Sequence, residues 1–261
     1  MINCQNVDSE IFQSWNRCIE NSVNINISKP QISISNFELQ KKLKKEEKLI
    51  SIFEITANEI LAIANNYSYG FLLFDKDKIV ISKITSQKNS DQLKEHGIKP
   101  GVSFSEKSIG VNSVAVADKK GDKIMLDKQD HFCHFMRKIS CCAVPLKISG
   151  SIIGFLCVNT GQNSEKENLK IIIDILSNAM INKLHLSECR KYKNRLSSQQ
   201  LKILSLLANG KTESEIAKDL NYSVQTIKYH KRKIFDKFEV DNTRTAITKL
   251  YKYNDSKCSY K

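Results

Sequence analysis

Proline, glycine and long apolar runs are scarce in this chain of 261 residues. Its 3 prolines and 9 glycines are too few for long flexible or Pro-rich linkers, so we expect its folded parts to be joined directly. No apolar run approaches the roughly 18 residues of a membrane-spanning helix, and no signal peptide follows Met1. We therefore expect a cytoplasmic protein, without a membrane partner, that has room for two ordinary domains.

Motifs for metal binding, phosphate binding and catalysis are also missing. The 8 cysteines include no Cys-x-x-Cys pair and are scattered over a chain that is too large to need disulfides, so most should be reduced thiols. No Gly-x-x-x-x-Gly-Lys-Ser/Thr loop occurs, and no nucleophile–base pattern stands out. We therefore expect no enzyme, and the sequence identifies no cofactor.

Positive charge is concentrated in the last quarter of the chain. The formal net charge is +13; residues 190–261 carry 17 basic and 7 acidic side chains, whereas residues 1–189 carry 24 and 21. A block of this kind favours a polyanion as partner. A membrane surface would attract it too, but the chain offers no apolar anchor, which leaves nucleic acid as the favoured partner.

The densest part of this block, residues 223–238, has the pattern of an amphipathic helix. Val224, Ile227, Ile234 and Phe238 recur at helical spacing, and Ser223 stands where an N-cap hydroxyl would accept from the first free amides. Five basic residues and one acidic residue occupy the other side. The pattern fits a solvated helix in an ordinary bundle as well as a helix that binds nucleic acid.

The residues before this basic helix favour the second interpretation. A helix beginning near residue 198 has a stop signal at Asn209-Gly210. Thr212 and Glu215 then form the capping box of a second, short helix. Asn221 and Tyr222 leave room for only a tight turn before the basic helix. Two short helices joined by a tight turn, with the second one basic, are typical of the helix-turn-helix motif.

Specific positions of this region match a known family. They are Leu196-Ser197, Gly210, Glu215-Ile216-Ala217, Ser223-Val224, Thr226-Ile227-Lys228, His230, Ile234, Lys237-Phe238 and Val240. With these marks, residues 195–253 resemble the LuxR-type (NarL/FixJ-like) four-helix DNA-binding domain. Gln199-Gln200 depart from it, because the family usually has a charged pair with a glutamate there. The resemblance implies double-stranded DNA as partner and a homodimer on it, with RNA polymerase as a further candidate.

One face of the basic helix carries Gln225, Lys228, Tyr229 and Arg232, because these residues lie at positions i, i+3, i+4 and i+7. The LuxR-type resemblance directs Lys228, Tyr229 and Arg232 towards base edges. Phosphate contacts are then predicted for Thr226 at the helix start and for Lys231 and Lys233 on its flanks, although any single lysine also fits a solubilising role. The predicted DNA-binding residues are Ser223, Gln225, Thr226, Lys228, Tyr229, Lys231, Arg232 and Lys233.

The first 160 residues mix helix and strand patterns. The sequence predicts helices over residues 11–19, 36–66 and 105–120, a hairpin over 70–84, a strand over 122–127, a short helix or loop over 131–137, and a second hairpin over 141–160. This mixture predicts an α+β domain with an antiparallel sheet and helices on it. The C-terminal domain is predicted to be all-α.

Three segments carry a second resemblance: PGVSFSEKSIGVNSVAVA, QDHFCHF and SCCAVPLKISGSIIGFLCVNT. They resemble the GAF-like sensor domain of activators of acetoin and dihydroxyacetone catabolism, and the likeness extends over residues 10–160. It implies a small-molecule effector. Val111 replaces a usual threonine and Cys157 a common aspartate, so the ligand would differ or be lost. The ATPase module of those activators does not follow.

An effector would lie between the sheet and helices of such a sensor, although the same residues also fit an ordinary core. A local cluster of His131, Cys133, His134, Cys141 and Cys142 leaves a metal or redox-active thiol site open, while its spacing matches no standard metal site. The predicted ligand-binding residues are Phe71, Phe104, Glu106, Asn112, His131, Phe132 and Cys141.

We divide the chain into a helical lead-in (1–66), a GAF-like sensor (67–163), a connecting helix (164–192) and a helix-turn-helix domain (193–261). The connecting helix packs on the sensor sheet, pairs with its copy in a dimer, or does both. The predicted function is sequence-specific transcription regulation in response to a small molecule or a redox signal. The alternative is a redox- or metal-sensing or protein-interaction module that binds nucleic acid non-specifically. One side of the connecting helix would contain Ile172, Ile175, Leu176, Ala179, Ile181 and Leu184.

Overall fold

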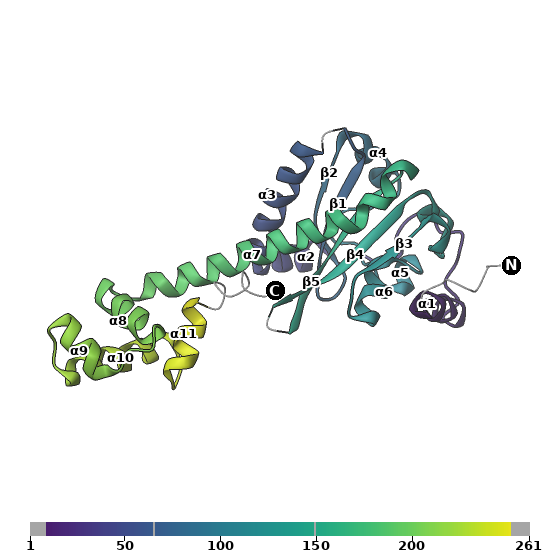
Figure 1. Cartoon of the computed structure of the whole chain (residues 1–261). Helices are drawn as coiled ribbons and strands as arrows, with labels where there is room; N and C mark the ends of the chain where they lie inside the picture. Colours follow the sequence, from purple (N-terminus) through teal and green to yellow (C-terminus); the bar gives the residue numbers. More distant parts are fainter. Residues whose placement is uncertain (1–8, 65, 149, 252–261) are drawn as a thin grey trace. The chain divides into compact units, whose positions relative to one another are not determined.

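The computed structural model describes residues 9–64, 66–148 and 150–251, which form two compact units (Figure 1). The first unit ends at Ile181 and the second begins at Asn182. This division falls inside one helix, α7 (Leu169–Arg195). The domain limits that we place at residues 163 and 193 stay a prediction.

An antiparallel sheet forms the centre of the first unit. Its strand order is β2-β1-β5-β4-β3, with two hairpins, β1–β2 and β4–β5, joined side by side. The predicted α+β class and both predicted hairpins are confirmed. The strands are β1 (Tyr69–Asp75), β2 (Val80–Thr85), β3 (Ile124–Leu126), β4 (Ser140–Ile148) and β5 (Ser151–Thr160).

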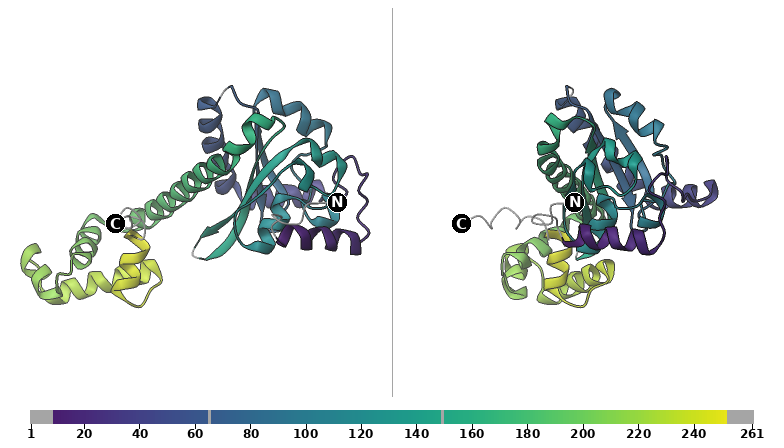
Figure 2. Two further views of the ribbon diagram at one scale, coloured as in Figure 1. Left: turned by 45° about the vertical axis from the view of Figure 1, so that its right-hand side comes forward. Right: turned by 90° about the vertical axis from the view of Figure 1, so that its right-hand side faces the viewer.

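The two faces of the sheet carry different residues, and this decides what the candidate sensor residues can touch. Leu72 pairs with Cys157, which pairs with Ala143, so all three lie on one face. Phe71 and Cys142, one residue away on their strands, point to the other face. The first face is covered by α5 and α6 with α1 outside them, and the second by α3 and the first part of α7 (Figures 1 and 2).

The single helix predicted over residues 36–66 is wrong, because the structure has two helices there. They are α2 (Asn36–Lys45) and α3 (Glu47–Ile63), and Glu46 between them has non-helical angles. On α2, Lys42 forms ion pairs with Asp75 and Asp77 in the β1–β2 turn. The next helix buries Phe53 against the sheet. A straight helix would not reach both targets, and the charged sequence around Glu46 gives no sign of the break.

The single helix predicted over residues 105–120 is also divided, into α5 (Glu106–Ile109) and α6 (Ser113–Lys120). Gly110 between them has a φ of +70°, and a Cβ built on it would lie 2.9 Å from Phe132 Cβ and from Cys133 Sγ. Asn112 then caps α6 by accepting from two backbone amides. Glycine is therefore required for this break and for the packing of the loop after β3.

The connecting helix also differs from the prediction. A 3-10 segment (Asn163–Asn168) precedes α7, and the buried side of α7 is rotated by about one residue from the predicted one. Ile175, predicted to line that side, is 54% exposed. The shift follows from how α7 packs on the sheet, which the spacing of apolar residues does not determine. The buried residues are Leu169, Ile173, Leu176, Met180 and Leu184.

The remaining elements of the first unit surround the sheet. None of the described helices is long and apolar enough to cross a membrane. No element is predicted over the residues of α4, which are mostly polar. These elements are α1 (Ser9–Glu20), α4 (Gln87–Glu95), and the 3-10 segments Lys128–Asp130 and His134–Lys138.

Four helices follow α7 in the second unit and enclose a separate apolar core, as predicted. Ile203, Ile216, Ile227, Ile234 and Phe238 are at most 1% exposed and belong to this one cluster. The helices are α8 (Ser198–Ala208), α9 (Glu213–Leu220), α10 (Val224–Phe238) and α11 (Thr243–Tyr251).

Candidate nucleic-acid interface and sensor core

Local capping fixes the tight turn between α9 and α10. Thr212 and Glu215 form the predicted capping box at the start of α9. Asn221 ends that helix in the left-handed region, with a φ of +53°. Two residues later, the Ser223 hydroxyl accepts from the Thr226 amide and opens α10. The result is a connection of three residues, 221–223, that holds the basic helix at a fixed angle to α9.

Burial of one side of α10 determines which residues it presents to solvent. Ile227, Ile234 and Phe238 face the core, whereas Val224, predicted as a fourth core residue, is 36% exposed because it lies at the first helical position. On the opposite side, Tyr229 is 58% exposed. The exposed set there is Gln225, Lys228, Tyr229, Arg232 and Lys233. These five side chains form one surface, as the helical spacing predicts.

The cations of α10 are not equivalent. Lys231 is half-buried, pairs with Glu213 of α9 and lies over the Phe235 ring. Lys228 and Arg232 are exposed, and with Lys231 and Glu213 they line a cavity of about 190 Å³. Much of the Lys231 charge is therefore already compensated within the domain, which leaves Lys228 and Arg232 better placed for an external partner.

The start of α10 is suited to an anion. The hydroxyl groups of Ser223 and Thr226 lie 2.8 Å apart at a helix N-terminus, where backbone amides carry partial positive charge. Ser223 is exposed and Thr226 half-buried. Thr226, a predicted phosphate contact, thus borders the exposed surface, as does Ser223, which also serves as the cap.

Gln200 is one of the two residues that depart from the charged pair usual in the LuxR-type family, and its contacts show how the domain accommodates a glutamine there. It is only 6% exposed, and its Oε1 accepts from the Ser197 amide at 3.1 Å and from Lys237 Nζ at 2.8 Å. A glutamate at this position would place a carboxylate against the same lysine. The glutamine keeps the hydrogen bonds and lacks the charge.

Gln200→Glu is therefore expected to stabilise the second unit by about 0.5–1 kcal/mol, because an ionised acceptor strengthens both hydrogen bonds and favours a helix N-terminus. Urea unfolding of the second unit in the full chain measures this. Gln199→Glu is the matched control, since Gln199 bonds to Tyr222 at the surface. A loss of stability in Gln200→Glu would contradict this prediction. It would mean that the free-energy cost of burying the carboxylate exceeds the stabilisation from its interaction with Lys237.

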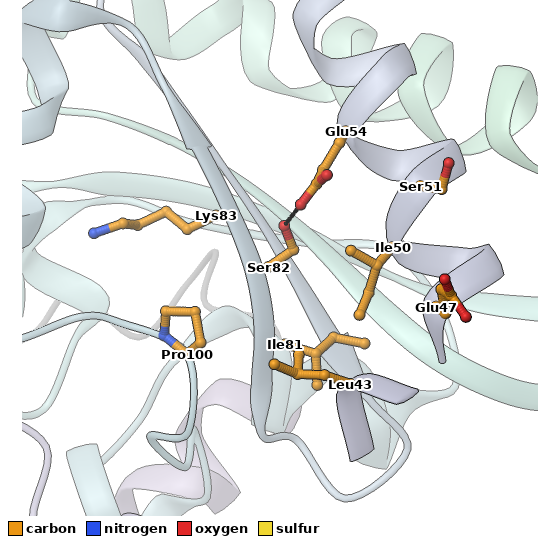
Figure 3. A pocket seen from close by; sticks show the side chains of 9 residues that line it. All are labelled: Leu43, Glu47, Ile50, Ser51, Glu54, Ile81, Ser82, Lys83 and Pro100. Atoms are coloured by element: carbon orange, nitrogen blue, oxygen red, sulfur yellow. Dashed lines mark hydrogen bonds between the residues drawn. The ribbon is translucent and has the colours of Figure 1, made fainter. Parts of the chain in front are cut away.

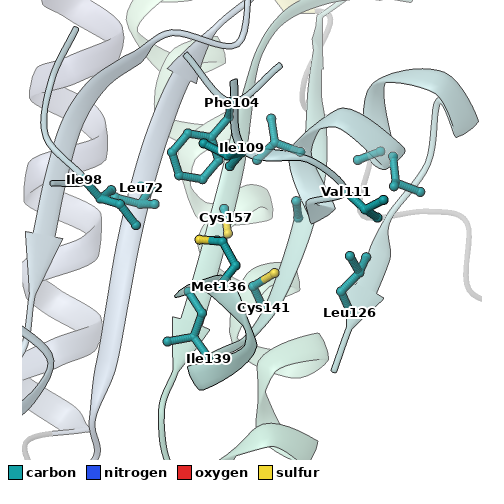
Figure 4. Close-up of a cluster of buried hydrophobic side chains, with 14 of the residues drawn as sticks. Leu72, Ile98, Phe104, Ile109, Val111, Leu126, Met136, Ile139, Cys141 and Cys157 are labelled. Carbon is teal, nitrogen blue, oxygen red and sulfur yellow. The ribbon is translucent and has the colours of Figure 1, made fainter. Parts of the chain in front are cut away.

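The seven predicted ligand residues fall on two faces of the sensor sheet. Phe71 lies on the face opposite the others, beside the Tyr69 ring at 6.5 Å. Phe104, Phe132 and Cys141 belong to the apolar core under α5 and α6. Figure 4 shows Phe104 and Cys141 there. The structure therefore does not bring Phe71 together with the remaining six.

Glu106 and Asn112 have protein partners for their polar atoms. Glu106 accepts from the Ser14 hydroxyl at 2.6 Å and from Arg17 at 2.7 and 2.9 Å. Burial acts to raise the pKa of Glu106, but the bonds from Arg17 and Ser14 outweigh it and lower that pKa. Asn112 donates to Phe104 O and Gly110 O. A ligand is not needed to satisfy either residue.

His131 and Cys141 form a buried pair. His131 is 0% exposed; its Nδ1 lies 3.2 Å from Asp127 O and its Nε2 3.1 Å from Cys141 Sγ. Burial disfavours charge on both groups, yet their mutual attraction raises the pKa of His131, and together with a hydrogen bond from Cys157 it lowers the pKa of Cys141. The contact therefore acts in favour of the charged form of both groups.

The wider Cys/His cluster is not assembled as a metal site. Cys142 faces the opposite side of the sheet from Cys141, and Cys133 Sγ donates to Asn24 O. Within residues 9–64, 66–148 and 150–251, no group of three or more His, Cys, Asp and Glu side chains is arranged to hold a metal ion. His131 and Cys141 are the members that contact each other.

Two surface cavities of the sensor were not predicted as sites. One, of about 250 Å³, has Glu106 on its wall together with Arg17, Lys78 and Lys119. The other, of about 480 Å³, lies between α2, α3 and β2 (Figure 3), and none of the seven predicted residues lines it. It depends on the break at Glu46, so the sequence carries no signal for it. Its lining consists of Leu43, Glu47, Ile50, Ser51, Glu54, Ile81, Ser82, Lys83 and Pro100.

Comparisons with known proteins support both units to different extents. Residues 194–250 match the GerE family model, described as bacterial regulatory proteins of the luxR family. No curated protein matches the chain. A chain of the crystal structure of the Escherichia coli DhaR(N)–DhaL complex is similar with a TM-score of 0.62 at 16% identity, covering 74% of this chain and 67% of that chain.

Further solved structures are less similar overall. Escherichia coli SdiA has a TM-score of 0.31 at 15% identity, covering 82% of this chain and 96% of that chain. A GAF domain/HD domain protein from Geobacter sulfurreducens has a TM-score of 0.34 at 14% identity, covering 51% of this chain and 92% of that chain. The DhaR(N)–DhaL likeness shows a shared fold, and the family match indicates DNA-binding transcription regulation.

Proposed function

We propose that this chain, whose residues 194–250 form a LuxR-family helix-turn-helix domain, is a cytoplasmic, sequence-specific transcription regulator. The observation that carries the proposal is the exposed surface of α10, where Lys228, Tyr229 and Arg232 project from a helix held by a three-residue turn. A helix presented in this way fits the major groove of DNA, and its cations supply the attraction to phosphates.

We propose distinct roles for the side chains of α10. Lys228, Tyr229 and Arg232 contact base edges, with Gln225 beside them, and Ser223, Thr226 and Lys233 contact the sugar-phosphate backbone. Lys231 contacts a phosphate only by leaving Glu213, so its contribution to DNA affinity is smaller than that of a free lysine. This ranking within one helix follows from the contacts that each side chain makes in the free protein.

The regulator acts, in this proposal, as a homodimer. Support comes from the part of α7 in the first unit, where Ile171 and Ile175, about one helical turn apart, are 61% and 54% exposed. An exposed apolar stripe of this kind favours pairing with a second copy. RNA polymerase is a further partner once DNA is bound. Sedimentation of the full chain with and without its DNA tests the dimer, and a monomer on DNA would refute it.

The sensor unit is proposed to respond to a small-molecule effector or a redox signal. Because Glu106, Asn112 and His131 already have protein partners, an effector that reaches them must replace those bonds. A metabolite that binds only the folded sensor would raise its melting temperature with increasing concentration. His131→Ala is expected to remove that shift, and a shift of equal size in this variant would place the effector elsewhere.

Selection of genomic fragments by the full chain tests the proposed function. We expect a small set of fragments that share one sequence with two half-sites, since a symmetric dimer reads a palindrome. Arg232→Ala should enrich no common sequence. Wild-type protein that retains fragments without any shared sequence would favour the alternative, a module that binds nucleic acid non-specifically.

A further inference from the structure

The sensor core holds one thiol that differs from the others. Cys18, Cys133, Cys141, Cys142 and Cys157 are all free and buried. Burial raises the pKa of Cys18 and Cys142 to about 12 and that of Cys133 to about 11. Cys141 is equally buried, but a hydrogen bond from Cys157 and the contact of its Sγ with His131 Nε2 at 3.1 Å lower its pKa. The thiolate is the nucleophilic form of cysteine.

A second thiol lies beside this one. Cys141 of β4 pairs with Asn159 and Cys157 of β5 pairs with Ala143, so the two cysteines are diagonal neighbours on adjacent antiparallel strands. Both side chains point to the same face of the sheet (Figure 4). Ser113 Oγ lies 3.6 Å from Cys157 Sγ. The two thiols are thus neighbours on one face of the sheet, and one of them contacts an imidazole.

We propose that Cys141 and Cys157 are a modification site at which hydrogen peroxide forms a disulfide across β4 and β5. The inference rests on the sensor role proposed above and gives its redox signal a chemical identity. Cys157 occupies the position at which the resemblance expects an aspartate, so the second thiol is a property of this chain.

The reaction balances with the groups present. The Cys141 thiolate attacks one peroxide oxygen; a sulfur–oxygen bond forms, the oxygen–oxygen bond breaks, and the departing hydroxide takes a proton from the His131 imidazolium and leaves as water. Cys157 sulfur then attacks the Cys141 sulfenic acid; the sulfur–sulfur bond forms and the hydroxyl leaves as a second water with the Cys157 proton. Two thiols are oxidised and one peroxide is reduced.

Burial selects the oxidant. Cys141 and Cys157 are 2% and 3% exposed and His131 is 0% exposed, so a reagent must enter through a transient opening of the cover. That cover includes Gly110 and the short segment from Phe132 to Lys138, which is held by 3-10 turns rather than a regular helix. Hydrogen peroxide is small enough to enter, whereas bulky cumene hydroperoxide is expected to react at least tenfold more slowly.

The test uses the full chain with Cys4, Cys189 and Cys258 replaced by serine, so that the five thiols of the sensor core remain. Hydrogen peroxide should consume two of these five, and mass spectrometry of the alkylated digest should show the peptide containing Cys141 joined to the peptide containing Cys157. Cys141→Ser and Cys157→Ser should each abolish the link. Cys142→Ser is the matched control, since Cys142 is adjacent and buried on the other face, and it should leave the link intact.

Several results would overturn the inference. They are loss of the link in Cys142→Ser, a stable sulfinic acid on Cys141 with Cys157 still reduced, or no oxidation of either thiol by peroxide. Circular dichroism of each reduced variant verifies that it is folded. If a variant is unfolded, the reaction of hydrogen peroxide with the protein that retains both Cys141 and Cys157 decides whether the disulfide forms. Genomic-fragment selection reads the DNA-binding function separately, so failure of the thiol chemistry and failure of the regulator proposal are distinguishable.

Discussion

Arg232→Ala and Lys228→Ala are each expected to reduce discrimination between specific and non-specific DNA by about 1–3 kcal/mol, or roughly 5- to 150-fold in relative affinity. Both side chains are exposed on α10 and stand on the face opposite its buried residues. A bidentate contact to a guanine edge is worth this amount, and alanine cannot replace it. Titration of the selected site and a scrambled site against each variant measures the change.

Two other lysines serve as controls for this experiment. Lys231→Ala removes a charge from the same helix, but one that is paired with Glu213, so it should weaken both DNA sequences alike and only modestly. Lys202→Ala removes an exposed charge from α8 and should change neither affinity. If Arg232→Ala kept the full sequence preference, the orientation of α10 in the groove would be wrong.

Phe238→Ala is expected to unfold the second unit while the first stays folded. Phe238 is 1% exposed, contacts the Tyr192 ring at a centroid distance of 5.1 Å, and is fixed by a bond from Lys249 to its carbonyl. Truncating a buried phenylalanine costs about 3–5 kcal/mol, which is a large part of the stability of a small domain. Thermal unfolding followed by circular dichroism should lose the transition of the second unit.

The matched control for Phe238 is Tyr229, an aromatic residue of the same helix that is 58% exposed. Tyr229→Ala should change the free energy of unfolding by less than about 0.5 kcal/mol, although it should weaken DNA binding. A Phe238→Ala variant in which both transitions fall together would show that the two units are not independently stable.

The C-terminal helices were predictable because their signals are local. Ser197, Thr212 and Ser223 are N-caps in the structure, and each stands directly before an apolar helical pattern. The LuxR-type resemblance is confirmed over residues 194–250. The pairing of Lys231 with Glu213 could not be predicted from the sequence, since that contact joins two helices and depends on the angle between them.

The sensor was predictable in its strands and less so in its helices. Short apolar runs on either side of turn residues locate both hairpins, but the break at Glu46 and the rotation of α7 result from tertiary packing, which local propensity does not encode. The candidate site in the sensor could likewise be predicted only in part. The motifs around His131 and Cys141 were recognised separately, and the contact of Cys141 with Cys157 follows only from the register of β4 and β5. The ligand-binding role of the predicted residues stays a prediction.

The most direct measurement of the central claim is the affinity of the full chain for its selected site relative to a scrambled site of the same length, over a range of salt concentrations. The account predicts a ratio of at least about 10³ near physiological salt, and it predicts that affinity for the scrambled site falls steeply as salt rises. A ratio near one at every salt concentration would contradict it and leave α10 as a non-specific basic helix.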